Sequence, residues 1–477
     1  MPRTTEASRG VASPALERRL GPVDAAAIIV SNVIGGGILF TPPQVAALVP
    51  DAGLFLSTWI AGGALAFAGA MAYAELAAVR PRAGGEYVYL REAFGDAAGF
   101  LTGWTSFVAG FSGAIATSAV VMVFYIGRFA PALAGSGSWL VIPIVPGVIA
   151  LTLSPQTITA VLIIAAMAWL HRRGIGPGRV VGNLLASLKV TAFVLFIAVG
   201  FSWGSGTLAH LSDRSATGTG GWLLALIPVM FTYSGWNAAA YVAEEIRNPG
   251  RNVPRALAIG TAAVILIYVL MNALYLYVIP VRDLAAINRS VLDVIADRLL
   301  GSYAGNIMGI VSIISLAASI SAMTLAGPRV YYAMARDRLF FARTAVVHPR
   351  YRTPSSAIIA QAVWSSLLVL TATAGALVNY TGFAIVLFSG VAVAALFVLR
   401  RREPDAQRPF RAWGYPLAPA IYAVASVAIL LNGLYRAPGA TGAGALIIAA
   451  GLPVYAAFRR QRQIPSPKSQ TPNPNVT

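Results

Sequence analysis

Residues 34–43 read IGGGILFTPP and place three consecutive glycines near the middle of an apolar segment that runs from residue 22 to residue 48. Glycine costs about 1 kcal/mol more than alanine inside a helix, so three in succession favour an unwound stretch. A close-packing face for a neighbouring helix is the alternative, because small residues serve that purpose in membranes. The glycine run alone does not separate these two interpretations.

A second interruption lies in the apolar segment from 222 to 244, where residues 231–237 read FTYSGWN. The two interruptions lie five apolar segments apart. Paired discontinuous helices at corresponding positions indicate a transporter that is built from inverted repeats. The second interruption therefore favours unwinding in both segments.

Twelve apolar segments, most of them long enough to cross a bilayer as a helix, follow one another along the chain. They lie at residues 22–48, 53–78, 97–127, 155–171, 177–203, 222–244, 254–280, 303–335, 355–374, 377–399, 415–435 and 440–458. The chain is 57% hydrophobic and only 11% charged, which excludes a water-soluble core. The sequence predicts an all-α integral membrane protein, with an outer loop or re-entrant segment in the proline-interrupted stretch from 129 to 155.

The spacing of the interruptions predicts a 5+5 inverted repeat. We expect helices 1–5 in residues 21–204, helices 6–10 in residues 222–401, and two added helices, 11 and 12, in residues 402–463. Residues 1–20 lack the apolar stretch of a signal peptide and are expected to form a polar tail. Residues 464–477 are rich in Pro, Ser and Asn, which is typical of a disordered tail.

The net charge of +18 could suggest nucleic-acid binding, but the basic residues follow membrane topology instead. With the N-terminus inside, the basic residues on the outer side are Arg128, Arg214, Arg282, Arg289, Arg298 and Arg436. All others outside the helix cores fall on the inner side. This asymmetry predicts cytoplasmic N- and C-termini, contact with anionic membrane lipid and no nucleic-acid partner. The expected location is the bacterial inner membrane.

The chain has no cysteine and only three histidines, which fall in loops or at helix ends. Disulfides, thiolate metal sites and a disulfide-linked partner subunit are therefore excluded. The sequence leaves the oligomeric state open, with a monomer as one of the alternatives. The apolar segments carry no paired carboxylates at mid-membrane. The sequence thus predicts no enzyme activity, no metal and no cofactor.

An unwound helix exposes backbone groups that suit a zwitterion. The free N–H groups around Gly36, Gly37 and Ile38 carry partial positive charge and suit a carboxylate. Carbonyl groups at the ends of the first half-helices, near Ile34, Phe231 and Ser234, suit an ammonium group. Together they match the head of an α-amino acid without burying a charged side chain in lipid.

The run IGGGILFTPP resembles the IGSGIFxxP motif of the amino acid–polyamine–organocation superfamily. Residues 231–257 are similar to the helix 6 to helix 7 signature of its L-type amino-acid transporter branch, and further similar stretches lie at 72–95, 331–340 and 399–411. This resemblance implies a LeuT-type fold with helices 1 and 6 discontinuous. One departure is Gly36, which stands where the family usually has a small hydroxyl residue.

The resemblance also implies the substrate-binding residues, between the unwound parts of helices 1 and 6. They are Ile34, Gly35, Gly36, Gly37, Phe231, Ser234 and Asn237, to which the free N–H groups add Ile38. Phe231 is expected to act as an aromatic lid over the substrate. The alternative for this side chain is packing or lipid contact, the commoner fate of phenylalanine in a membrane.

Lys189 is an ionisable residue inside helix 5, and such a residue is a functional hypothesis by default. Snorkelling to the inner headgroups is the structural alternative. The resemblance places Lys189 where sodium-dependent relatives hold a cation between helices 1 and 8, with Ser315 and Ser319 of helix 8 facing it. Transport is therefore expected to be independent of sodium, and the lysine either stays charged or releases a proton during transport.

Charged residues at the inner ends of helices are less informative. We expect Glu75 and the group Glu244, Glu245, Arg247, Arg251 and Arg255 to be solvated loop charges, with an inner-gate ion pair as the alternative.

The expected function is transport of neutral L-amino acids, as an exchanger or a proton symporter. Small side chains are favoured because Ser234 stands where L-type relatives that accept large aromatics resemble a Gly-Gly pair. The alternatives are a non-transporting amino-acid receptor and a cationic amino-acid or polyamine transporter. The last would place acidic side chains near the helix 6 interruption, where this chain offers Ser234 and Asn237.

Overall fold

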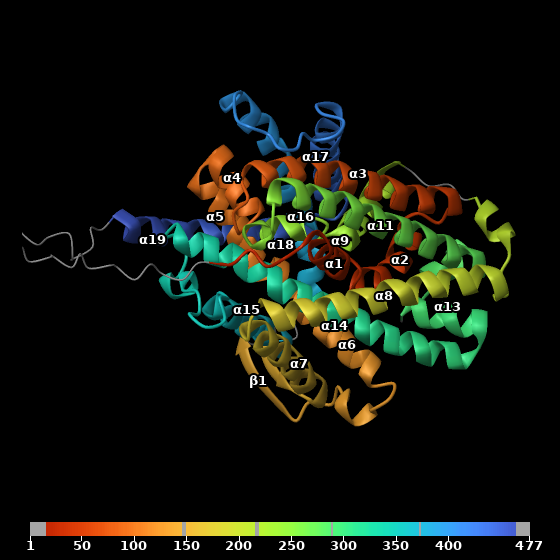
Figure 1. The fold of residues 1–477 in the computed structure, drawn as a ribbon. Coiled ribbons are helices and arrows are strands. Elements are labelled where there is room, and N and C mark those ends of the chain that lie inside the picture. Colours follow the sequence, from red (N-terminus) through yellow and green to blue (C-terminus); the bar gives the residue numbers. More distant parts are fainter. Residues whose placement is uncertain (1–15, 146–148, 215–218, 288–289, 372–373, 464–477) are drawn as a thin grey trace, which may run out of the picture.

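The computed structural model describes residues 16–145, 149–214, 219–287, 290–371 and 374–463 (Figure 1). The tail predicted at 464–477 and most of that predicted at 1–20 lie outside the described residues.

Helices make up almost all of the described structure. The first half of the chain contains α1 (Pro22–Val33), α2 (Gly36–Leu48), α3 (Ala52–Val79), α4 (Glu86–Phe94), α5 (Asp96–Thr105), the π-helix η1 (Ser106–Gly110), α6 (Phe111–Ile126), the short turn η2 (Pro131–Leu133), strands β1 (Leu140–Val145) and β2 (Ile149–Leu153), α7 (Pro155–Arg172), α8 (Ile175–Trp203) and η3 (Leu208–Ser212).

The second half contains α9 (Thr219–Tyr233), α10 (Ala238–Tyr241), η4 (Ala243–Glu245), α11 (Pro249–Val278), α12 (Val281–Ala285), α13 (Val291–Leu300), α14 (Ser302–Arg336), η5 (Ala342–Ala345), α15 (Ser355–Leu370), α16 (Ala374–Arg402), α17 (Leu417–Arg436), α18 (Pro438–Ala449) and α19 (Gly451–Gln463).

Eight helices among the described residues are long and apolar enough to cross a membrane, and nine if the bent pair α1 and α2 counts as one span. Two shorter apolar helices occupy Gly221–Tyr233 and Ser355–Leu370. Each of the twelve predicted apolar segments overlaps at least one of the helices, so the all-α membrane fold is confirmed. The exact number of spans stays a prediction.

The broken helices lie at the centre of the bundle (Figure 1). The first half-helix α1 packs against α8, α11 and α14, and the second half-helix α2 packs against α9. Two further pairs, α3 with α11 and α6 with α14, form the largest helix contacts around them. Among the candidate spans α14 is the most deeply buried, whereas the last span, which α18 and α19 form, is the most exposed.

The proline-interrupted stretch after α6 forms an antiparallel hairpin of β1 and β2, which the sequence did not predict. Figure 1 shows this hairpin beside α7 at the edge of the bundle. Ser154 then caps α7, since its hydroxyl accepts from the Thr157 N–H at 3.2 Å, and Pro155 occupies the first helical position. The hairpin is thus followed directly by a well-capped helix N-terminus.

Candidate functional site

The first broken helix divides at two residues, Ile34 and Gly35, and its halves are bent by 44°. A Cβ atom added to Gly35 would lie 2.6 Å from Ser319 Oγ, so the close approach of α14 requires glycine here. Gly36 and Gly37 already belong to α2. The break is therefore shorter than the glycine run suggested.

The first turn of α2 presents free N–H groups, as its position after the break requires. Gly36, Gly37 and Ile38 are its first three residues, and the first N–H groups of a helix have no partner within it. A Cβ on Gly37 would lie 2.9 Å from Thr232 Cγ2, so glycine also allows α2 to approach α9. The partial positive charge of this helix start can attract a carboxylate.

Lys189 reaches the first break from α8. Its Nζ donates to Ser31 O at 3.1 Å, to Ile34 O at shorter range, and to Ser319 Oγ at 3.4 Å. The lysine is 0% exposed, so it does not snorkel to the surface. An ammonium group has three hydrogens, and three acceptors surround this one.

The carbonyl oxygen of Ile34 is surrounded by internal donors. Besides Lys189, it accepts from Ser319 Oγ at 3.0 Å and from Ser315 Oγ at 3.2 Å. We expected this carbonyl to receive the substrate ammonium group. Because α8 and α14 already supply donors to Ile34 O, the expected ammonium acceptors that remain are the carbonyl groups near Phe231 and Ser234.

Tyr268 of α11 lies where the two breaks meet. Its hydroxyl is 2.7 Å from Val33 O, at the end of α1, and 3.2 Å from Thr232 O, near the end of α9. Both carbonyls belong to the final turn of a half-helix, where they lack partners within the helix. One side chain therefore connects the two breaks.

The second broken helix divides between α9 and α10, over Ser234–Asn237. Gly235 has a φ of 99°, and a Cβ there would lie 2.9 Å from Asn32 Cγ, so glycine is required for both conformation and space. The Ser234 N–H donates to Phe231 O at 3.0 Å and closes a turn. The interruption predicted from FTYSGWN is present.

A cavity of about 430 Å³ lies between the two breaks, with further walls from η1, α6 and α16. At one end it is lined by Gln44, Leu48 and Leu224, of which Gln44 is exposed. These residues belong to the side of the bundle that the sequence predicts to be outer. At the other end Glu86 is buried.

The predicted site residues divide into two groups around this cavity. Those that line it are Gly35, Gly36, Gly37, Phe231, Ser234, Asn237 and Ser319. Those that are buried in the packing behind it are Ile34, Ile38, Lys189 and Ser315. The second group contributes backbone atoms or supports the break.

Glu86 is a cavity residue that the sequence analysis missed. Its carboxylate accepts from Tyr73 Oη at 2.6 Å and from Asn237 Nδ2 at 2.7 Å. Burial raises the pKa of the Glu86 carboxyl above its ordinary value, while hydrogen bonds from Tyr73, Tyr241 and Asn237 act in the opposite direction. The premise that no acidic side chain lies near the helix 6 interruption is therefore wrong.

Two glutamates that we expected to be solvated are buried ion-pair partners instead. Glu245 receives Arg329 Nε at 2.6 Å and Arg329 Nη2 at 3.0 Å, and both side chains are 0% exposed. Glu75, 1% exposed, pairs with Arg400 at 2.8 Å and with Arg408 at 3.3 Å. The solvated-charge expectation is wrong for both, because distant parts of the chain supply their partners.

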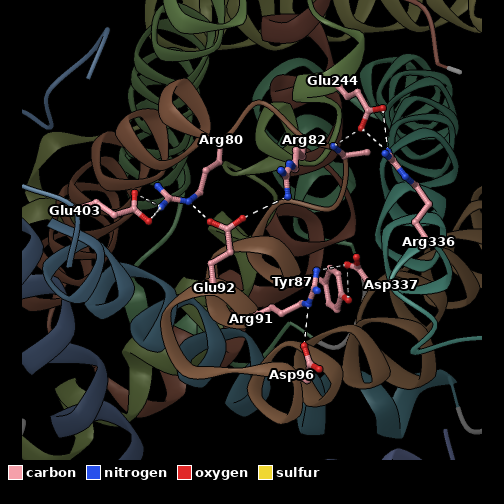
Figure 2. Close-up of polar contacts among 11 residues, drawn as sticks. Arg80, Arg82, Tyr87, Arg91, Glu92, Asp96, Glu244, Arg336, Asp337 and Glu403 are labelled. Atoms are coloured by element: carbon pink, nitrogen blue, oxygen red, sulfur yellow. Dashed lines mark hydrogen bonds and ion pairs between the residues drawn. The ribbon is translucent and has the colours of Figure 1, made fainter. Parts of the chain in front are cut away.

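A second set of ion pairs is more exposed than those of Glu245 and Glu75 and lies on the arginine-rich side of the bundle, which the sequence predicts to be inner (Figure 2). These pairs connect residues in or near the ends of α3, α4, α14 and α16. The ion pairs are Arg80 with Glu92 and Glu403, Arg82 with Glu92, Arg91 with Asp96 and Asp337, and Arg336 with Glu244. The Tyr87 hydroxyl also donates a hydrogen bond to Asp337. Exposed pairs contribute little individually, but a network across four helices restrains their relative motion. These contacts hold the ends of several helices together on this side of the bundle.

Comparisons with known proteins agree on one family. A family model described as amino acid permease matches residues 20–458. The chain is 30% identical over 460 residues to the large neutral amino acids transporter small subunit 2 of Mus musculus, covering 94% of this chain and 82% of that relative. It is 29% identical over 451 residues to the Asc-type amino acid transporter 1 of Mus musculus, covering 92% and 81%. The serine/threonine exchanger SteT of Bacillus subtilis is 28% identical over 451 residues, covering 94% and 98%.

Proposed function

Because the chain belongs to the amino acid permease family, on the L-type branch of the amino acid–polyamine–organocation superfamily, we propose that it transports small neutral L-amino acids by alternating access. Membership of the family establishes the general function. The chain is a multi-pass membrane protein that transports amino acids, and it is not an enzyme.

The proposal that the substrates are small neutral amino acids rests on the cavity between the two helix breaks. The free N–H groups of Gly36, Gly37 and Ile38 begin α2 at its wall and suit the substrate carboxylate. Ser234 narrows the opposite wall, which favours small side chains. The similarity to a serine/threonine exchanger supports the same substrate class.

We propose that Lys189 takes the position of a coupling cation, which makes transport independent of sodium. Its contacts to α1 and α14 support this proposal, because they join the same two helices that the resemblance assigns to a cation site. A lysine that stays charged suits exchange or facilitated diffusion. Release of a proton from Lys189 during the cycle would instead couple transport to protons.

We further propose that the N- and C-termini lie in the cytoplasm of a bacterial cell, because the basic residues concentrate on that side. In this orientation the exposed Gln44 lines the cavity on the outer side, and the buried pairs of Arg329 with Glu245 and of Arg400 with Glu75 lie on the inner side. This arrangement favours an outward-open conformation. Reporter fusions at Arg9 and after Arg462 should both read cytoplasmic. A periplasmic signal from either fusion would overturn this orientation.

Counter-flow in proteoliposomes tests the function directly. A labelled panel should include alanine, serine, leucine, phenylalanine, lysine and putrescine, with and without sodium and with and without a proton gradient. We expect accumulation of alanine and serine without sodium. Binding without accumulation would identify a receptor, and preferential uptake of lysine or putrescine would identify a cationic transporter. A sodium requirement would contradict the assignment of Lys189.

A further inference from the structure

The exposed residues of α11 form a single line along the helix. They are Arg251, Arg255, Ile259, Ala262 and Leu266. Steps of three or four residues place side chains on one face of a helix, one above the other. The outward face of α11 is therefore basic at its inner end and apolar from Ile259 onwards.

The apolar part of this face is about as long as one leaflet of a bilayer. Ile259 and Leu266 are large side chains that are 66% and 60% exposed. Arg255 and Leu266 are about 16 Å apart along the helix axis, and half of the hydrocarbon core is about 15 Å thick. No residue of α11 from Ile267 to Val278 is exposed. The exposed face thus extends from the level of the inner headgroups to about the middle of the membrane.

The two arginines at the inner end of this face have no acidic partner in the described part of the chain. Neither Arg251 nor Arg255 forms an ion pair or a side-chain hydrogen bond there, and α11 has no acidic residue in its first turn. Arg329 and Arg400, on the same side of the bundle, are instead paired with buried glutamates. Because a guanidinium group matches the geometry of a phosphate, the unpaired arginines suit an anion from outside the chain.

The loop between α16 and α17 adds to this surface. A Cβ on Gly250 would lie 3.0 Å from Pro409 Cβ, so the lack of a side chain allows this loop to contact the start of α11. Shortly after Pro409, Arg411 is exposed and Trp413 is 58% exposed. Tryptophan is enriched at the headgroup level of membranes. The loop therefore brings a further arginine and an interfacial aromatic residue close to the start of α11.

We propose that the exposed face of α11 is a binding site for an anionic phospholipid of the inner leaflet. Arg251 and Arg255 bind its phosphate, and an acyl chain lies along Ile259 and Leu266. A soluble phosphate would leave the apolar face uncovered, and a neutral lipid would not neutralise the arginines. An anionic phospholipid matches both parts of the surface.

The general excess of basic residues on the inner side does not by itself require such a site. What distinguishes α11 is that its unpaired arginines continue directly into an exposed apolar face. The same helix carries Tyr268, whose hydroxyl contacts Val33 O and Thr232 O at the two breaks. A bound lipid would therefore stabilise the helix that connects the breaks.

Lipid binding and thermal unfolding of the full-length chain in detergent provide the test. The probe is phosphatidylglycerol, with phosphatidylcholine of the same acyl chains as the neutral comparison, and native mass spectrometry measures the bound fraction. We expect phosphatidylglycerol to bind more tightly than phosphatidylcholine and to raise the unfolding temperature, since a ligand of the folded state stabilises it. Arg255→Gln should lower the affinity for phosphatidylglycerol about fivefold, and Arg251→Gln combined with Arg255→Gln should lower it further.

Arg338→Gln is the matched control. Arg338 is also exposed on the inner side, but it follows α14, in which residues 315–335 are all buried. The same charge is thus removed from a place without an exposed apolar face. Its affinity for phosphatidylglycerol should stay within about twofold of the wild type. An equal loss in Arg255→Gln and Arg338→Gln would indicate general surface attraction and would overturn the inference.

Two further measurements separate a lipid from a soluble anion. Ile259→Ala combined with Leu266→Ala keeps the arginines but shortens the apolar contact, so it should weaken phosphatidylglycerol binding several-fold. Inorganic phosphate and glycerol 3-phosphate should not displace the lipid. Unchanged affinity in the double variant, displacement by either soluble anion, or equal binding of phosphatidylcholine contradicts the inference. Because binding is measured without transport, a chain that binds the lipid but exchanges no amino acid contradicts only the proposed function.

Discussion

The two broken helices are held by groups of opposite charge. At the first break the ammonium group of Lys189 satisfies carbonyl oxygens at the end of α1. At the second break the carboxylate of Glu86 binds the side-chain amide of Asn237. The start of α2 supplies free N–H groups beside the first break, whereas the second break presents the side-chain amide of Asn237 to the same cavity. The two breaks are therefore held by different chemistry, and substitutions at one can be compared with substitutions at the other.

Removal of the Lys189 ammonium group at the first break should reduce transport more than any other substitution considered below. We expect Lys189→Ala to lower alanine exchange by at least about tenfold, since each hydrogen bond to a charged group contributes about 1.5–3 kcal/mol and three acceptors lose their charged donor. Initial rates in proteoliposomes, normalised to reconstituted protein, provide the measurement.

Lys189→Met distinguishes charge from packing at the first break. Methionine keeps an apolar stem in the space between α8 and α1 but cannot donate to Ile34 O. We expect it to be as impaired as Lys189→Ala. If it transports normally across a range of pH, the ammonium group is not what holds the first break.

Stability of the two breaks should depend on individual glycines. Gly235→Ala combines an unfavourable φ of 99° with a contact 2.9 Å from Asn32 Cγ, and Gly35→Ala places a Cβ 2.6 Å from Ser319 Oγ. We expect each to destabilise the protein by about 1–3 kcal/mol, measured as a lower thermal unfolding temperature in detergent.

Gly36→Ala is the matched control for this pair. A Cβ there would first meet Leu316 Cδ2, at an ordinary 3.8 Å. Its unfolding temperature should equal that of the wild type. Equal destabilisation by Gly35→Ala and Gly36→Ala would indicate that glycine is needed along the whole run, as the sequence first suggested, rather than at one close contact.

Sequence alone located both breaks because their signals are local. Three glycines at 35–37 and the run SGWN at 234–237 interrupt apolar segments. The low helix propensity of glycine predicts breaks at such positions. It also singled out Lys189, since a lysine inside an apolar segment is conspicuous. It did not predict the π-helix η1, whose residues Ser106–Gly110 carry no breaking signal.

The burial of three acidic residues was not predicted, for a different reason. Glu86, Glu75 and Glu245 lie near ordinary loops in the sequence, where charges are usually solvated. Their burial depends on partners far along the chain, such as Asn237 for Glu86 and Arg329 for Glu245. No local pattern encodes those pairings, so only the tertiary structure reveals that these carboxylates lie inside.

The smallest expected effect concerns substrate size at the second break. Ser234 lines the cavity beside Gly235, and Ser234→Gly removes one side chain from the wall. Each buried CH₂ group of a larger substrate contributes about 0.8 kcal/mol, so leucine and phenylalanine should compete several-fold better against labelled alanine in this variant. Ser234→Ala removes only the hydroxyl and keeps Cβ, so it should not widen the substrate range. A wild type that already prefers leucine or phenylalanine would contradict this interpretation, because the wall formed by Ser234 would then not limit the cavity.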